Sequence, residues 1–207
     1  MHVIVRHCVS TSTKPRPDGF DRKELFRALM DTLIGVDVHV VLDANPDDVH
    51  FIDQWDAHPF TLHRQHLGSD GDSLRFAIGL AVGWTGTVVF LEDDYRVAPG
   101  WIELIAEGLR FSSYVTLYDH PDKYSRLYAG LTSQLFLGSR HWRTVPSTTN
   151  SWATSAAVLV EDKDIHCAYG SRDHEKFLAL WSRGRRLVSC MPGAWSHEEV
   201  AMKTPVT

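Results

Sequence analysis

Short apolar runs and longer stretches with helical periodicity alternate along the first half of the chain. Buried strands are predicted at Val3 to Val9, Val36 to Leu42 and Thr87 to Leu91, and a shorter one at Val115 to Tyr118. Because helical patterns separate these runs, the sequence indicates an α/β fold. We expect a mostly parallel central sheet with helices on both faces.

The helices have recognisable start and stop signals. Asp21 and Glu24 have the spacing of a capping box, and apolar residues follow at helical spacing until Gly35, which suits a helix C-terminus. Between that helix and the first strand, the segment "STSTKPRPDGF" is expected to be a loop because of its two prolines and its glycine. Further helices are predicted over 73–82, from Pro99, and over 173–182.

The second half departs from strict alternation. From Leu131 to Val160 the pattern is strand and loop, with "SQLFLGSRHW" and "AAVLV" as the predicted strands. A further strand is predicted at Arg186 to Cys190, and the tail from Met191 has a loop-like pattern. A mixed sheet in a single domain of 207 residues is therefore expected.

Composition narrows the classes of function. The net charge is −5, with 21 basic and 26 acidic residues, which argues against a general polyanion binder and makes a nucleic-acid partner unexpected. The cysteines number three, which indicates reduced thiols and a cytoplasmic protein. The longest uncharged run, from Phe76 to Leu91, is too short and glycine-rich to span a bilayer, so no transmembrane segment is predicted.

Acidic residues follow several of the predicted strands. Glu92, Asp93 and Asp94 come directly after one apolar run, while Asp43 and Asp119 end two others. Because ligands of open α/β sheets bind beyond the carboxyl ends of the strands, these acids are expected to gather at one edge. Adjacent carboxylates repel, and a divalent cation such as Mn²⁺ or Mg²⁺ is the simplest neutralising partner. The alternative is an ordinary solvated loop.

Four stretches in order resemble one family. "VVFLEDDYRVAPGW" resembles the strand-end acidic motif of nucleotide-sugar glycosyltransferases of the GT-A fold, and it is most similar to small bacterial and viral, family 2-like members. "STSTKPRPDGF" resembles their first nucleotide-contacting loop, "TLYDHPDKY" a segment of the same subset, and "RRLVSCMPGAWSH" their C-terminal strand with its trailing histidine. The resemblance implies a single GT-A domain over 1–207, with a nucleotide-binding half at 1–120 and an acceptor-binding half at 121–207.

The resemblance also implies roles for individual residues. Asp94 and His197 would ligate a divalent metal, Mn²⁺ or Mg²⁺, that bridges the donor's two phosphates. The expected nucleotide-binding residues are Ser10, Lys14, Arg16, Asp43, Arg75, Glu92 and Asp93. Lys14 and Arg16 could equally be solvated loop cations, and Asp43 could instead cap the turn that follows it. The leading Glu92 stands where the family more commonly has Asp, so the roles of Glu92 and Asp93 stay open between ribose contact and ordering of metal-bound water.

Asp173 is the expected catalytic base. An inverting transferase needs a carboxylate to take the proton of the acceptor hydroxyl, and in this fold it commonly lies at the start of a late helix. "GSRDHEKFLALW" places Asp173 there, with Glu175 as second choice. Asp173 could instead be a helix cap or a first-turn acid.

Aromatic residues of the second half are candidates for the acceptor surface. One or two of Trp142, Trp152, Trp181 and Trp195 are expected to be exposed near the site, with Trp152 and Trp195 as the acceptor-binding candidates.

The predicted function is therefore a metal-dependent, inverting glycosyltransferase that moves a sugar from a nucleoside-diphosphate sugar, a UDP-sugar on family grounds, to a glycan or other hydroxyl acceptor. Three alternatives stay open. They are a catalytically silent nucleotide-sugar or glycan-binding module, a transferase acting on a modified DNA base, and a sugar-phosphate nucleotidyltransferase. The last should carry a glycine-rich basic loop directly after the first strand, and here no glycine precedes Gly19.

Overall fold

A computed structural model gives the fold, and it describes residues 1–9, 15–124 and 133–199. The strands are β1 (His2–Cys8), β2 (Asp37–Asp43), β3 (Thr61–Gln65), β4 (Thr87–Glu92), β5 (Tyr95–Val97), β6 (Tyr114–Thr116), β7 (Leu135–Leu137), β8 (His141–Val145), β9 (Trp152–Ser155), β10 (Leu187–Met191) and β11 (Trp195–His197). The helices are α1 (Arg22–Asp31), α2 (Asp70–Ala81), α3 (Trp101–Gly108), α4 (Ala156–Glu161), α5 (Lys163–Tyr169) and α6 (Asp173–Ser182), with short 3₁₀ turns η1 (Phe51–Gln54) and η2 (Pro121–Tyr124).

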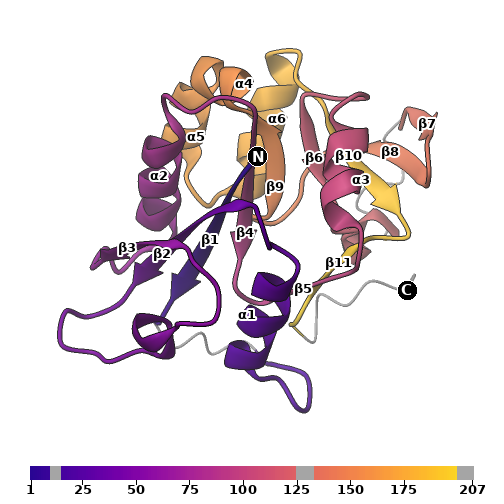
Figure 1. Ribbon diagram of the computed structural model, residues 1–207. Coiled ribbons are helices and arrows are strands. Elements are labelled where there is room, and N and C mark those ends of the chain that lie inside the picture. The colour runs from indigo at the N-terminus through magenta and orange to yellow at the C-terminus, as the bar shows by residue number, and fades with distance from the viewer. Residues whose placement is uncertain (10–14, 125–132, 200–207) are drawn as a thin grey trace.

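Nine of the described strands form one mixed sheet, in the order β3-β2-β1-β4-β9-β6-β10-β8-β7 (Figure 1). The run from β3 to β4 is parallel, as is the β6–β10 pair, while β9 is antiparallel to both β4 and β6. β5 and β11 form a separate antiparallel ribbon. The predicted mixed, mostly parallel α/β sheet is confirmed.

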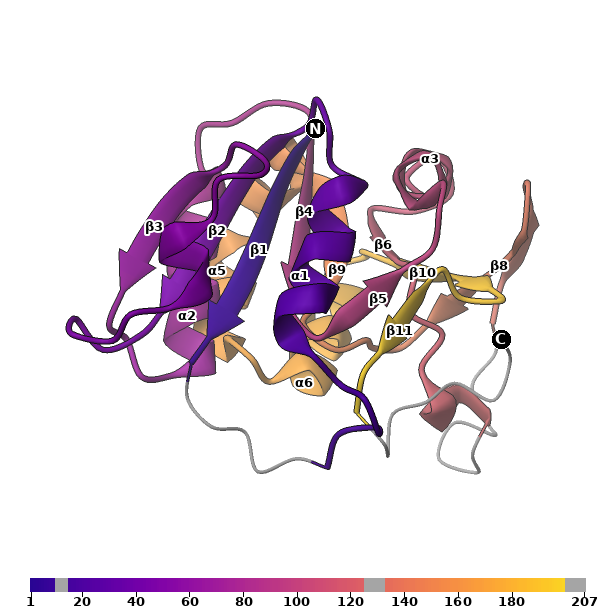
Figure 2. The same cartoon turned by 60° about the horizontal axis from the view of Figure 1, so that its bottom comes forward.

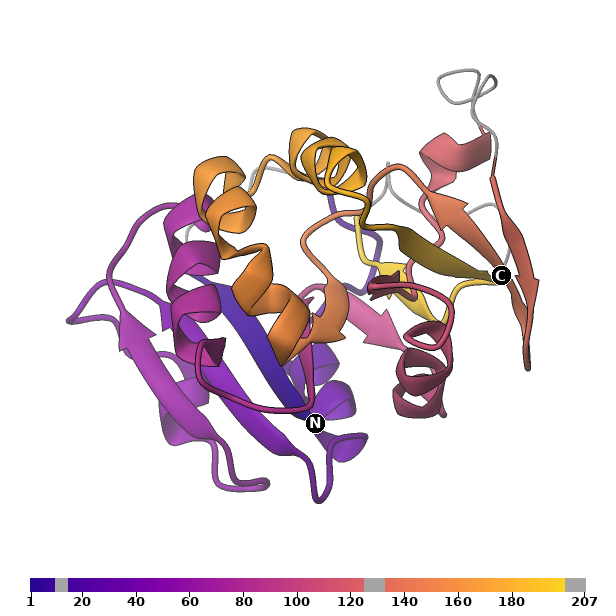
Figure 3. The same cartoon turned by 90° about the horizontal axis from the view of Figure 1, so that it is seen from above.

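Helices cover both faces of the sheet. Figures 1 and 2 show α1 and α3 on one side, and Figure 3, seen from above, shows the purple α2 and the orange α4 to α6 on the other. Strand residues alternate between the two sides, as the period of two in a β-strand requires. In β1, Val3 and Val5 pack in the core beneath α1 and α3, while Ile4 packs in the core beneath α2 and α6.

Asp21 caps α1 as predicted, whereas the Glu24 carboxylate pairs with Arg27 at 2.8 Å and does not complete the predicted capping box. The Asp21 carboxylate accepts hydrogen bonds from the backbone N–H groups of Lys23 (2.8 Å) and Glu24 (3.2 Å). Leu25, Phe26 and Leu29 then bury the predicted stripe, which holds α1 against the sheet. This helix begins just after the loop that leads from the end of β1.

Several predicted elements are wrong. "AAVLV" forms helix α4 rather than a strand, because Ser155 accepts a hydrogen bond from the Val158 N–H as its cap, and Ala156 and Leu159 bury one helical face. A short apolar run does not distinguish these states by pattern alone. "SQLFLGSRHW" is not one strand, since β7 and β8 form a hairpin that turns at 138–140. The third helix begins at Trp101 rather than Pro99.

Two further features were not predicted. The tail contains strand β11, which pairs with β5 and brings His197 opposite Tyr95. A helix, α5, precedes the predicted α6. Among the described residues, no helix has the length and apolar character needed to cross a membrane.

Candidate active site

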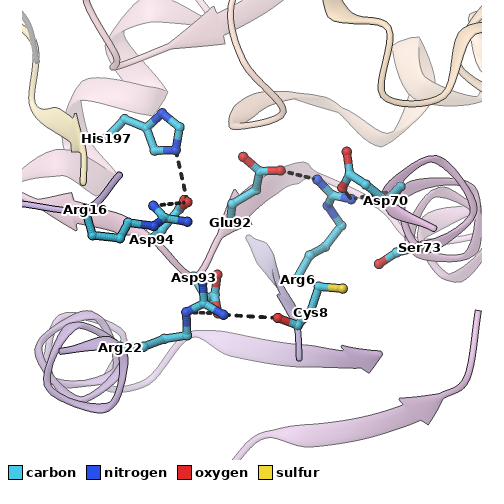
Figure 4. A pocket seen from close by; sticks show the side chains of 10 residues that line it. All are labelled: Arg6, Cys8, Arg16, Arg22, Asp70, Ser73, Glu92, Asp93, Asp94 and His197. Atoms are coloured by element: carbon cyan, nitrogen blue, oxygen red, sulfur yellow. Dashed lines mark hydrogen bonds and ion pairs between the residues drawn. The ribbon is translucent and has the colours of Figure 1, made fainter. Parts of the chain in front are cut away.

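A cavity of about 270 Å³ lies beyond the carboxyl ends of β1 and β4 (Figure 4). The parallel register pairs Arg6 of β1 with Glu92 of β4, so the ends of the two strands meet at this edge. The lining residues are Arg6, Cys8, Arg16, Arg22, Asp70, Ser73, Glu92, Asp93, Asp94 and His197. The three acids therefore lie together at the predicted edge of the sheet, and three arginines and one histidine surround them.

Asp94 and His197 are in direct contact. His197 Nε2 lies 3.0 Å from Asp94 Oδ2, and Arg16 Nη1 donates to the same oxygen at 2.8 Å. The β5–β11 pairing fixes His197, whose ring stacks on Tyr95 with centroids 4.7 Å apart. Burial opposes ionisation of Asp94, but hydrogen bonds and charge from His197 and Arg16 outweigh it and lower its pKa to about 2. The carboxylate is therefore ionised.

Glu92, Asp94 and His197 form a trio of side chains that could hold a metal ion. Ligand atoms of Glu92, Asp94 and His197 all lie within 4.8 Å of one another. Asp94 Oδ1 and His197 Nδ1 are buried and have no hydrogen-bond partner among the described residues. Two carboxylates and an imidazole suit Mn²⁺, and a buried oxygen without a donor is what a cation would satisfy. The donor set therefore fits the predicted metal.

Glu92 is also held by a buried arginine. Arg6 is only 4% exposed, and its guanidinium donates to Glu92 Oε1 at 2.8 Å and to Asp70 Oδ1 at 2.7 Å. Burial raises the pKa of Glu92 to about 8, although the Arg6 charge opposes this shift. Arg6 thereby ties the end of β4 to the N-terminal turn of α2.

The middle acid, Asp93, faces a different set of partners. Its Oδ2 forms an ion pair with His7 Nδ1 and lies 3.3 Å from Arg22 Nε of α1. The His7 ring in turn contacts His50, with Nε2 atoms 3.0 Å apart. Asp93 therefore links the strand end to α1, while the two flanking acids belong to the metal-binding trio.

Asp173 lies at the first position of α6, within a buried polar network. Lys176 Nζ is 2.7 Å from Asp173 Oδ1 and also donates to Asn150 Oδ1 at 3.2 Å. Asn150 Nδ2 donates to Asp70 Oδ2 at 3.0 Å, which connects α6 to the Arg6 cluster. Asp173 makes no side-chain cap hydrogen bond, because Arg172 occupies the N-cap position.

The environment of Asp173 suits a base at neutral pH. Burial raises its pKa to about 6, against the opposing charge and hydrogen bond of Lys176 and the charge of Arg6. Asp173 does not line the cavity, but it is near enough to Arg6 and Asp70 for their charges to affect it. Glu175, the second choice, is exposed.

Asp43 and Arg75 lie outside this cavity. Both oxygens of the buried Asp43 accept backbone N–H groups, from Leu67 at 2.6 Å and from Gly68 at 3.0 Å, so it caps the loop after β3. Asp43 also lines a second cavity of about 290 Å³ that shares Cys8 with the first. Arg75 donates to the Cys167 carbonyl oxygen at 2.7 Å and to Asp72, and it holds α2 to α5.

The remaining strand-end acid, Asp119, is not in the cavity either. It is fully buried, and it accepts from Arg143 Nη2 at 2.7 Å and from the Tyr124 hydroxyl. Ser10 and Lys14 lie outside the described residues. Arg16, from the same loop, donates to Asp94 and lines the cavity, and its contact with a nucleotide stays a prediction.

Trp152 and Trp195, the two acceptor-binding candidates among the four tryptophans, are not exposed as predicted. Trp142 and Trp152 are 0% exposed and Trp195 is 1% exposed, because all three indoles pack in the hydrophobic cores of the sheet. Only Trp181 is half-buried, and the Arg186 guanidinium stacks on it. Trp152 and Trp195 therefore form core contacts and present no face to an acceptor.

Sequence reasoning missed Arg6, Asp70 and Lys176. The signal for Arg6 was its position inside the apolar run of β1, where a charge requires a buried partner. Lys176 stands three residues after Asp173, the spacing that places two side chains on one helical face. Nothing in the sequence indicated that Asn150 would join α2 and α6.

The comparisons with known proteins agree with this geometry. The chain is 30% identical over 146 residues to the pre-mycofactocin glycosyltransferase of Mycobacterium tuberculosis, which covers 67% of this chain and 31% of that protein. The chain thus spans about a third of the length of that relative. No family model matches the sequence.

Solved structures share the fold. Staphylococcus aureus TarS in complex with UDP-GlcNAc superposes with a TM-score of 0.58 at 15% identity, over 94% of this chain and 56% of that one. A nucleotidyl transferase from Methanothermobacter gives 0.57 at 14% identity, over 92% and 88%. A CMP:2-keto-3-deoxy-manno-octonic acid synthetase complexed with CTP gives 0.55 at 16%, over 98% and 92%. The predicted GT-A-like fold and the resemblance to nucleotide-sugar transferases are thus confirmed.

Proposed function

We propose that this chain is a metal-dependent, inverting glycosyltransferase that transfers a sugar from a UDP-sugar to a hydroxyl acceptor. The observation that carries the proposal is the trio of Glu92, Asp94 and His197 beside the carboxyl end of β4, with a partly buried acid, Asp173, at the start of α6 nearby. The similarity to a mycobacterial glycosyltransferase supports the same reading.

In this proposal Asp94 and His197 hold the divalent cation, with Glu92 as the third group. The ionised Asp94 supplies charge, and the buried Oδ1 is available for a ligand. When bound, such a cation supplies Lewis-acid stabilisation of the diphosphate that leaves the sugar. Arg16 now donates to Asp94 and also to the Glu198 carbonyl oxygen at 2.9 Å, so it ties the C-terminal segment to the metal-binding residues.

The two adjoining cavities suggest how the donor lies. Arg16 and Arg22 line the first cavity, where positive charge suits the diphosphate. The second cavity, beside the ends of β1 and β2, would take the nucleoside, with Asp43 and His66 among its walls. Since both Asp43 oxygens already accept backbone hydrogens, its proposed contact with base or ribose would use the remaining lone pairs. Ser10 and Lys14 stay proposed contacts of the same loop.

Asp173 is the proposed base. It would take the proton of the acceptor hydroxyl as that oxygen attacks the anomeric carbon, opposite the departing diphosphate, so the anomeric configuration inverts. Lys176 holds the carboxylate, and its charge and hydrogen bond oppose the rise in pKa that burial of Asp173 causes. A base with a pKa of about 6 is mostly ionised at pH 7 and still accepts a proton.

Donor hydrolysis tests the proposal without knowledge of the acceptor. We expect the chain with Mn²⁺ to release UDP from a UDP-sugar, and we expect Asp173→Asn to bind the donor but to turn it over at least 100-fold more slowly. A silent binding module would bind the UDP-sugar without hydrolysing it. The absence of both binding and hydrolysis across a set of UDP-sugars would contradict the proposal.

A sugar-phosphate nucleotidyltransferase is the second candidate, because two of the solved structures with the same fold are a nucleotidyl transferase and a CMP:2-keto-3-deoxy-manno-octonic acid synthetase. It predicts release of pyrophosphate from a nucleoside triphosphate when a sugar 1-phosphate is added. The transferase proposal predicts no such release. Measuring pyrophosphate beside UDP release distinguishes the two activities.

A further inference from the structure

A second cluster of metal-binding side chains lies at the opposite end of the sheet. Two groups of three among the described residues bring potential ligand atoms within 4.8 Å, and the one outside the cavity is His2, Asp37 and His39. β1 runs from His2 to Cys8, and Cys8 lines the cavity. Since a strand rises about 3.3 Å per residue, the length of β1 places this cluster on the order of 20 Å from the trio of Glu92, Asp94 and His197.

The strand register builds this cluster. His2 of β1 pairs directly with Asp37 of β2, and His39, two residues further along β2, projects from the same face as Asp37. His2 Nδ1 lies 2.7 Å from Asp37 Oδ2, and His39 Nε2 lies 3.4 Å from the same oxygen. Three donors on adjacent strands thus converge on one point at the surface, where the side chains of His2 and His39 are 22% and 14% exposed.

The hydrogen bonds of the two imidazoles fix which nitrogens face that point. His2 Nε2 is 3.1 Å from the Thr85 carbonyl oxygen, which can only accept, so Nε2 carries a proton. Nδ1 then faces the Asp37 carboxylate, another acceptor. Two states of His2 fit these contacts. In one, the ring is an imidazolium and Nδ1 donates to Asp37. In the other, Nδ1 carries a lone pair, and a cation lies between it and the carboxylate. The Asp37 side chain is 53% exposed, so its oxygen is accessible to a cation from solvent.

His39 is oriented in the same way. Its Nδ1 lies 3.0 Å from His63 Nε2 of β3. A neutral His63 can accept the Nδ1–H of His39, which leaves His39 Nε2 free for a metal. Metal-binding histidines characteristically donate their second ring N–H to such a partner. Trp84 stacks on His2 and packs against His39, with centroids 4.6 and 4.5 Å away, and so restricts both rings.

We propose that His2 Nδ1, Asp37 Oδ2 and His39 Nε2 form a binding site for Zn²⁺, oriented by His63 and distinct from the catalytic metal site. Two imidazoles and one carboxylate form a three-ligand set that zinc accepts, with a fourth position open. The same set is poor for Mg²⁺, which prefers oxygen ligands. Since the ligands come from β1 and β2, zinc at this position would pin the first strand to the sheet. The proposal does not depend on the glycosyltransferase function.

The test is a titration with Zn²⁺, followed by isothermal calorimetry, of the full chain after removal of metals. The chain carries Asp94→Asn, so that the trio of Glu92, Asp94 and His197 does not bind the added zinc. We expect one equivalent of Zn²⁺ to bind and to raise the melting temperature, and Mg²⁺ to do neither. His39→Ala and Asp37→Asn should each weaken zinc binding at least tenfold, and His63→Ala should weaken it 10- to 100-fold through the lost orientation of His39.

His58→Ala is the matched control, because His58 is also paired with a surface aspartate, Asp31, at 2.8 Å, but is not in either trio. It should leave the zinc affinity unchanged. Each variant is first checked for native circular dichroism, so that loss of folding is not mistaken for loss of a ligand. Equal zinc affinity in the parent chain, His39→Ala and Asp37→Asn would overturn the proposal, because zinc would then be bound elsewhere.

Discussion

The three acids after β4 have three different environments, which explains why a buried strand ends on them. Asp94 faces His197 and Arg16, Asp93 faces His7 and Arg22, and Glu92 faces Arg6. Each acid therefore has at least one positive or imidazole partner, which offsets the cost of partial burial. Glu92 and Asp94 also come close enough to each other and to His197 to share a ligand, as proposed above.

Asp94→Asn should abolish metal-dependent turnover. The amide keeps the shape of the side chain but removes the ionised oxygen, so the chain loses a ligand and several kcal/mol of stabilisation of the leaving group, roughly a 100-fold or greater loss in kcat/KM. UDP release from a UDP-sugar at saturating Mn²⁺ measures it. Glu24→Gln, on the exposed face of α1, is the control and should retain full activity. An Asp94→Asn chain as active as the parent would exclude Asp94 as a ligand.

The pKa of Asp173 predicts an acidic limb in the pH profile. Because the proposed base must be ionised, kcat/KM for transfer or hydrolysis should fall as the pH drops through about 6. Lys176 lowers this pKa, so Lys176→Met should move the limb to higher pH. An activity that stays constant from pH 5 to 8 would argue against Asp173 as base.

Lys176→Met should also destabilise the fold, because the half-buried Asp173 loses its ion pair and the Asn150 carbonyl oxygen loses the donor Lys176. Breaking one side of a buried charge pair typically costs about 3–5 kcal/mol. Urea unfolding measures the change. Lys163→Met, at the exposed start of α5, is the matched control and should unfold within about 0.5 kcal/mol of the parent. Equal losses in the two variants would show that Lys176 has no special role.

Parts of the site that follow from a local sequence pattern were predictable, whereas parts that depend on pairing between distant strands were not. The β4 end, the Asp21 cap and the start of α6 each follow from local pattern, so Asp94 and Asp173 could be singled out from the sequence. The position of His197 depends on β11, a three-residue strand that a local pattern does not distinguish from a loop. The family resemblance, and not the hydrophobic pattern, pointed to that histidine.

The approach of α3 to the sheet is tight at its last residue, Gly108. A Cβ there would lie 2.8 Å from Val115 Cγ1 and from the Trp142 ring, both in the core. Gly108→Ala should therefore destabilise the protein by about 1–3 kcal/mol through overpacking. Gly79→Ala is the matched control, because Gly79 is an exposed position of α2 where a Cβ meets nothing within 4 Å. Its higher helix propensity should stabilise by up to about 1 kcal/mol, and thermal melts of both variants check the opposite signs.

For the whole molecule, alternating strands and helices were enough to predict the fold class, while the sheet order was not. The insertion of antiparallel β9 between β4 and β6 brings Asn150 and Ser151 beside the strand ends, since the Ser151 hydroxyl accepts from the Glu92 N–H at 3.1 Å. That neighbourhood arises from contacts between segments 59 residues apart, which no local pattern encodes. The same long-range packing buries Trp152 and Trp195, which were expected at the acceptor surface.

The proposed nucleotide and metal site lies at one edge of the sheet, and ligand-dependent stability tests this proposal directly. Thermal melts of the parent chain and of Asp94→Asn should be recorded with UDP, with Mn²⁺, and with both. At about 100 times its dissociation constant, UDP with Mn²⁺ should stabilise the parent by roughly 2.7 kcal/mol, which is on the order of 5–10 °C for a chain of this size. Asp94→Asn should lose most of that shift. A parent chain that UDP and Mn²⁺ together fail to stabilise would show that Asp94 and its neighbours do not form a nucleotide–metal site.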